Sequence, residues 1–203
     1  MSLLLTWLWT ASAHAECLSV ESLEQQHQAV ADSQRTPGAK DLSKKVAKQM
    51  LTAQKKGELC EPDASFWAAM NLLLAREAMY ADTAYEMAQE LMNARHPRGA
   101  WLAGLAYDRM SIAKGAAQSY GSQTSVQNSK RCLIWTDLTF TDAQRVQMGH
   151  PKLADTITGI LKANGVTGVA PTVLELKNRG LWCKPEPWDG SRSDLPDPYD
   201  GRK

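Results

Sequence analysis

The chain has 203 residues, of which 43% are hydrophobic, and this is enough for one globular domain with its own core. Lys and Arg together number 23 and Asp and Glu number 22, so the net charge is +1. This balance excludes the extended basic field that is typical of proteins that bind nucleic acid, and we expect no nucleic-acid partner.

The first fifteen residues have the pattern of a secretory signal peptide. A short apolar run, Leu3 to Trp9, precedes two small-x-small cleavage patterns, Ala11-Ser12-Ala13 and Ala13-His14-Ala15, although no Lys or Arg precedes the run. The run is far shorter than the ~20 residues that span a bilayer, and no later segment reaches that length. The sequence therefore predicts a signal peptide over 1–15, a periplasmic or secreted protein, and no transmembrane segment.

Four cysteines, Cys17, Cys60, Cys132 and Cys183, are far apart and form no C-x-x-C pair of the kind found in metal and redox sites. In an exported protein this number indicates two disulfides. Four cysteines allow three pairings. We favour Cys17 with Cys60 and Cys132 with Cys183, because these bonds would hold the N-terminal helix and the C-terminal segment against the middle of the chain.

Helical patterns dominate the first half of the chain. Apolar residues recur at intervals of three and four over 20–31, 41–56, 63–80, 83–94 and 99–112. The second segment carries lysines on its other face, which we interpret as solvated. The last three segments are joined by few residues, so we expect them to pack antiparallel.

The helical period fails from Gln118 onward. Segments 120–124 and 131–135 predict a small β-hairpin, and shorter helices are predicted over 141–148, 151–165 and 171–178. The Pro- and Asp-rich residues 184–203 predict an irregular tail. The expected fold is mainly α, a single antiparallel helical domain over 16–183 with a small β-hairpin and two disulfides.

Common catalytic motifs are missing from the sequence. It contains no phosphate-binding G-x-x-x-x-G-K-[ST], no G-x-S-x-G, no H-E-x-x-H and no G-x-G-x-x-G. After the predicted cleavage site only His27, His96 and His150 remain, each isolated in the sequence. We therefore predict no metal site and no cofactor.

The most polar junction lies between the last long helix and the predicted hairpin. Asp108 and Arg109 near the helix end are followed by Gln118, Tyr120 and Gln123, all of which form hydrogen bonds readily. These five residues are the candidate ligand-binding set. In an enzyme, Asp108 would be the general acid or base and Arg109 would hold an anionic group. In a structural role, the same two residues would bond to loop backbone, with Gly121 at a positive φ.

The same residues carry a resemblance to a family. A-Y-D-R at 106–109, then Gly115, Q-S-Y-G-S-Q at 118–123, and D-A-Q-R at 142–145 followed by Gly149 and Pro151 resemble a widespread bacterial family of unknown function. Its pattern is roughly D-R, G-x-x-Q-x-Y-G-T-Q and R-x-x-x-G-L-P. The likeness covers about residues 67–160.

Three departures from the family pattern stand out. Ser122 replaces a Thr, His150 replaces a Leu, and a central-helix His is replaced near Arg76 and Glu77. The resemblance implies that Asp108, Arg109, Gln118, Tyr120, Gly121 and Gln123 form one constellation, and it implies no activity.

These features favour an exported cell-envelope protein that binds a small polar ligand or a protein partner without catalysis, at a polar pocket around 108–123. Two alternatives remain open. One is a hydrolase-like enzyme that uses Asp108 and Arg109, and the other is a purely structural envelope protein.

Overall fold

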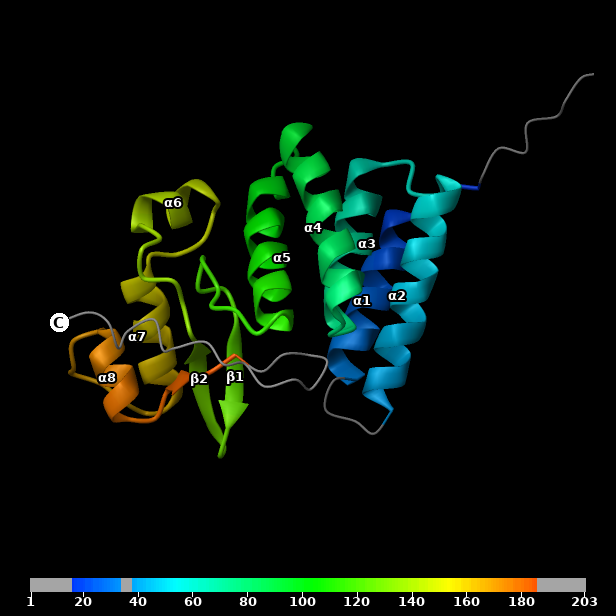
Figure 1. Ribbon diagram of the computed structural model, residues 1–203. Helices are drawn as coiled ribbons and strands as arrows, with labels where there is room; N and C mark the ends of the chain where they lie inside the picture. Colours follow the sequence, from blue (N-terminus) through cyan, green and yellow to red (C-terminus); the bar gives the residue numbers. More distant parts are fainter. Residues whose placement is uncertain (1–15, 34–37, 186–203) are drawn as a thin grey trace, which may run out of the picture.

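The computed structural model describes residues 16–33 and 38–185 (Figure 1). The predicted signal peptide and residues 186–203 of the predicted tail lie outside the described residues. Within them the chain forms eight helices and one three-stranded sheet, so the predicted mainly α class with two disulfides is confirmed. The helices α1 to α5 form one half of the molecule, and the sheet with α6 to α8 forms the other.

The helical half follows the predicted order of segments. Its helices are α1 (Val20–Ser33), α2 (Ala39–Lys56), α3 (Pro62–Leu74), α4 (Ala78–Asn93) and α5 (Gly99–Ala113). The central α3 packs against α1, α2 and α4, and α4 packs against α5. Small residues line these contacts, since alanines at 64, 68, 69, 81, 84, 88, 103 and 106 are almost completely buried. Such residues let neighbouring helices approach closely.

The predicted single helix over 63–80 is wrong, because α3 ends at Leu74 and α4 begins at Ala78. The reversal occurs at Arg76, whose φ of 52° is in the left-handed region that breaks a helix. Ala75 and Tyr80 on either side of the turn are buried in the core. Packing of α4 back along α3 therefore overrides the helical propensity of the turn sequence, and it leaves the Arg76 side chain exposed at the corner.

The start of α5 approaches α4 most closely at Gly99. A Cβ atom at this position would lie 2.6 Å from the backbone nitrogen of Met92 and 2.7 Å from the backbone carbon of Leu91. We expect Gly99→Ala to destabilise the protein by about 2–3 kcal/mol, because two helix backbones must move apart. Gly159→Ala in α7 is the matched control, since a Cβ there meets nothing within 4 Å. It should stabilise by about 0.5–1 kcal/mol. Chemical denaturation of both variants measures the difference, and equal effects would contradict the close approach.

The second half contains β1 (Thr124–Gln127), β2 (Lys130–Ile134), α6 (Asp142–Gln147), α7 (Leu153–Ala163), α8 (Val173–Asn178) and β3 (Trp182–Cys183). The strand order is β1-β2-β3. β1 is antiparallel to β2, with Thr124 opposite Leu133, and β3 is parallel to β2, with Leu133 opposite Trp182. The hairpin is confirmed, but its first strand lies four residues later than predicted, and β3 was not predicted.

Both favoured disulfides are present, Cys17–Cys60 and Cys132–Cys183. The first joins the segment before α1 to the connection between α2 and α3. The second joins β2 to the neighbouring β3, inside a core that includes Leu133, Ile157 and Leu176. Each bond therefore holds a chain segment against its half of the molecule.

Candidate functional site

Asp108 organises the loop that joins the two halves. Its side chain is fully buried, and its carboxylate accepts hydrogen bonds from the backbone N–H groups of Ser119 (2.7 Å), Tyr120 (2.9 Å) and Ser122 (2.9 Å). The Ser122 hydroxyl donates a fourth bond of 2.8 Å. Burial raises the pKa of Asp108, and these four bonds oppose the rise. Helix α5 thus fixes the loop through one carboxylate.

Gln118 closes the same loop from the other end. Its side-chain amide donates to the carbonyls of Gln123 and Ile134, and its side-chain oxygen accepts from the Gln123 backbone N–H. Its own backbone bridges Trp135 and Asp137 beside the sheet. Gln118 is completely buried. Asp108 and Gln118 therefore present no surface to a ligand, and their bonds favour the structural interpretation for these two residues.

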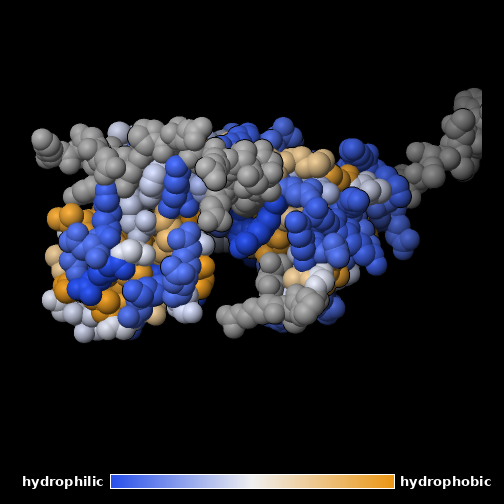
Figure 2. All heavy atoms as spheres, turned by 60° about the horizontal axis from the view of Figure 1, so that its bottom comes forward, coloured by the Kyte–Doolittle hydropathy of each residue, from blue (hydrophilic) through white to orange (hydrophobic). Residues whose placement is uncertain are grey.

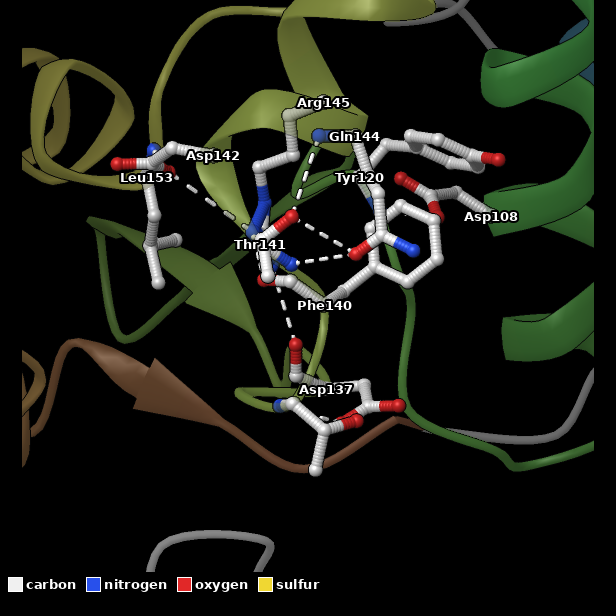
Figure 3. A network of polar contacts seen from close by, with 10 residues as sticks. Asp108, Tyr120, Asp137, Phe140, Thr141, Asp142, Gln144, Arg145 and Leu153 are labelled. Atoms are coloured by element: carbon white, nitrogen blue, oxygen red, sulfur yellow. Dashed lines mark hydrogen bonds and ion pairs between the residues drawn. The ribbon is translucent and has the colours of Figure 1, made fainter.

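Tyr120 belongs to the same loop, and its side chain packs among aromatic rings. Its ring makes an edge contact with Phe140 at 4.9 Å between centroids and lies 5.2 Å from the ring of His150 (Figure 3 shows Tyr120 beside Phe140). Burial raises the pKa of Tyr120 and lowers the pKa of His150. His150 also bonds to the Trp101 carbonyl at 3.0 Å. These rings attach the loop and the segment after α6 to α5.

Arg145 on α6 holds the next loop in the same manner. Its side chain is 1% exposed, and its guanidinium donates to the carbonyls of Phe140 (2.7 Å) and Asp137 (3.0 Å) (Figure 3). The helix itself begins with a capping box between Thr141 and Gln144. Arg145 is therefore a buried cation that stabilises backbone.

The Arg109 side chain points away from the hydrogen bonds that Asp108 and Gln118 make to the loop. Its Nη1 donates to the Leu73 carbonyl at 2.5 Å, and its Nε is buried without a hydrogen-bond partner among residues 16–33 and 38–185. Burial, and then the nearby charge of Arg76, lower the pKa of Arg109 to about 10. The guanidinium is thus anchored at one nitrogen, stays charged at neutral pH and has donors left over.

Arg109 lines a small pocket of about 160 Å³ between the two halves of the molecule. Helix α5 provides Arg109 and Ile112, and the turn between α3 and α4 provides Arg76. The sheet half provides Ile134 and Lys184, together with the polar residues Gln123, Thr124, Ser125 and Gln127. Three cations thus face the pocket, and its lining contains no Asp or Glu within the described part of the chain. Figure 2, with the lower side of Figure 1 turned forward, shows hydrophilic side chains beside a hollow between the halves.

Among residues 16–33 and 38–185, the cations of the pocket form no ion pair with an acidic side chain. Arg76 forms no ion pair with any residue that the structure describes, and Lys184 lies 5.6 Å from the ring centroid of Trp135. Some other cations are paired, such as Arg98 with Asp63 and Lys114 with Asp82. A concave surface with uncompensated positive charge attracts anions.

The structure divides the predicted site residues between two places. Arg109 and Gln123 line the basic pocket, Asp108 and Gln118 close the loop behind it, and Tyr120 packs among aromatic rings. Sequence reasoning missed Arg76 and Lys184. Arg76 was placed inside a helix, and only recognition of the turn there would have brought it to the pocket. Lys184 was assigned to the irregular tail.

A second, larger groove of about 780 Å³ lies between α1 and α2. Its floor includes Leu23 and Met50, and lysines of α2 lie at its rim. Lys44 forms an ion pair with Glu77, and Asp41 and Glu58 also line the groove. The charge of this surface is therefore mixed, so it indicates no particular ligand.

Comparison with known proteins gives no match to a family model, to a curated protein or to a solved structure. Within the described ranges, no group of three or more His, Cys, Asp or Glu side chains is arranged to hold a metal ion. None of the helices described is long and apolar enough to cross a membrane.

Proposed function

We propose that this protein is an exported, non-catalytic binding protein that takes a small anionic ligand in the basic pocket. One observation carries the proposal: Arg76, Arg109 and Lys184 converge on one pocket whose described lining contains no acidic residue. Bringing like charges together is unfavourable in the empty protein, and a bound anion removes that repulsion. The Leu73 carbonyl holds Arg109 in place before a ligand arrives, which reduces the entropy lost on binding.

Export is supported by the two disulfides, because such bonds persist in oxidising compartments outside the cytoplasm. The signal-like residues 1–15 give the same indication. N-terminal sequencing of the protein isolated from cells tests this part of the proposal. A chain that still begins at Met1 would contradict it.

The catalytic alternative has less support. Asp108 is the acid or base that it requires, and its carboxylate is fully buried and occupied by four hydrogen bonds. The structural alternative accounts for Asp108 and Gln118, but it gives no reason why three cations without an acidic partner among the described residues line one pocket. Anion binding accounts for the cations and also for Asp108 and Gln118. These two residues hold the loop that carries Gln123 and leads directly into β1 at the pocket.

The proposal is tested with Arg76→Asn, measured by calorimetric titration with a panel of citrate, succinate, phosphate and sulfate. Asn tolerates the positive φ of residue 76, so the variant should fold normally. We expect its affinity for the anions that bind wild type to fall by at least about tenfold, because a charged hydrogen bond is lost.

Arg95→Asn is the matched control. Arg95 is also exposed, also has a positive φ (59°) and does not line the pocket. The Arg95→Asn variant removes the same charge from the protein and should leave anion binding unchanged. If no anion binds wild type, or if both variants lose affinity equally, the pocket is not a ligand site and the structural alternative is favoured.

A further inference from the structure

We infer that the pocket takes a dianionic, tetrahedral phosphate group, either inorganic phosphate or the terminal phosphate of a monoester. This inference rests on the proposed anion-binding function and narrows its ligand class. It follows from the charge of the pocket, from its donors and from its size.

The charge of the pocket favours a dianion. Arg76 is close enough that its positive charge disfavours the charged form of Arg109, and Lys184 adds a third positive charge to the lining. A monocarboxylate brings one negative charge and leaves most of this repulsion in place. A phosphate monoester brings a charge of about −1.5 to −2 at pH 7 and compensates both guanidinium groups.

The donors of the pocket match a group with three acceptor oxygens. Guanidinium groups pair well with phosphate oxygens through parallel hydrogen bonds, and Arg109 keeps donors that no described residue uses. Ser125 and Gln127 lie on the half-buried face of β1, with Gln123 just before the strand, and all three line the pocket. Hydroxyl and amide donors here would complete the contacts that the cations begin.

The size of the pocket limits what enters it. Its volume of about 160 Å³ is below the roughly 300–1,000 Å³ that is usual for sites enclosing a drug-sized ligand. A phosphate group fits inside, and the remainder of a larger ligand would lie outside on the protein surface. The ligand is therefore recognised by its end group.

The experiment compares four soluble probes by calorimetric titration of the full mature chain. They are inorganic phosphate, the monoester phenyl phosphate, the diester diphenyl phosphate and succinate, with acetate as a monoanion reference. We expect phosphate and phenyl phosphate to bind at least about tenfold more tightly than the diester or acetate, and we expect Arg76→Asn but not Arg95→Asn to remove this preference.

The pH dependence gives an independent test. The second pKa of a phosphate monoester is about 6, so binding of phenyl phosphate should weaken severalfold between pH 7.5 and pH 5.5 as the dianion gains a proton. Inorganic sulfate stays dianionic over this range, so its affinity for the protein should be the same at both pH values. Sulfate therefore controls for changes in the protonation of the protein. The groups that concern the site are Arg76, Arg109 and Lys184, which line the pocket, and His27, whose pKa is affected by the charge of Arg109.

The two sources of phosphate are separated by the same titrations. Tighter binding of phenyl phosphate than of inorganic phosphate identifies an esterified ligand, and the reverse order identifies the free ion. If succinate or acetate binds best and the binding depends on Arg76, the anion site stands and the phosphate assignment is overturned. If no probe binds, the phosphate assignment is overturned, and if citrate and sulfate also fail to bind, the anion site is overturned with it.

Discussion

Replacement of Asp108 by Asn should destabilise the protein by roughly 3–5 kcal/mol. The carboxylate accepts three backbone N–H bonds and one hydroxyl bond in a site without solvent access. An amide keeps one acceptor oxygen and places an NH₂ group against donors, so buried N–H groups lose their partner at about 1–3 kcal/mol each. Urea unfolding followed by circular dichroism measures the loss.

The matched control is Asp82→Asn, which makes the same chemical change at the protein surface. Asp82 pairs with Lys114 at 2.9 Å, and both side chains are about half exposed. Its replacement should cost no more than about 1 kcal/mol. An Asp108→Asn variant as stable as Asp82→Asn would show that the carboxylate does not hold the junction loop, and the ligand role of Asp108 would then be open again.

Removal of the Cys132–Cys183 disulfide by replacing both residues with Ala should destabilise the protein by about 4 kcal/mol or more. The bond closes a sequence separation of 51 residues, for which loop-closure entropy alone gives about 4 kcal/mol. Both residues are also buried in the second core, so their smaller replacements lose packing. Urea unfolding of the double variant measures the total.

The Cys17–Cys60 double variant separates these two contributions. Its sequence separation of 43 residues gives nearly the same loop entropy, but both cysteines are exposed. It should therefore cost somewhat less than the Cys132–Cys183 variant. The opposite order would mean that packing of β3 against β2 does not depend on the bond.

Several features of this protein were determined by the sequence alone. Apolar residues at intervals of three and four predicted the helices, because a helix must bury one face whatever its neighbours are. The number and spacing of the cysteines favoured the two disulfides that the structure contains. The loss of helical period after Gln118 predicted a hairpin, although its first strand was misplaced, because polar residues at 120–127 give no clear alternation.

The site was predictable only in part. Asp108, Arg109, Gln118 and Gln123 were recognised as one polar cluster, but hydrogen-bonding capacity does not reveal whether a side chain bonds to backbone or to a ligand. Burial decides this, and burial depends on residues distant in the sequence. Asp108 is enclosed by the loop 119–122, whereas Arg109, the next residue on the helix, faces the opposite side and reaches Leu73.

The turn at Arg76 and the position of Lys184 were decided by the tertiary structure. Ala75, Arg76 and Glu77 have ordinary helical propensity, and the chain reverses there because α4 gains more by packing along α3 than by extending it. Lys184 reaches the pocket because β3 pairs with β2, a contact between segments about fifty residues apart. Local sequence determined the helices, and long-range packing determined which cations meet.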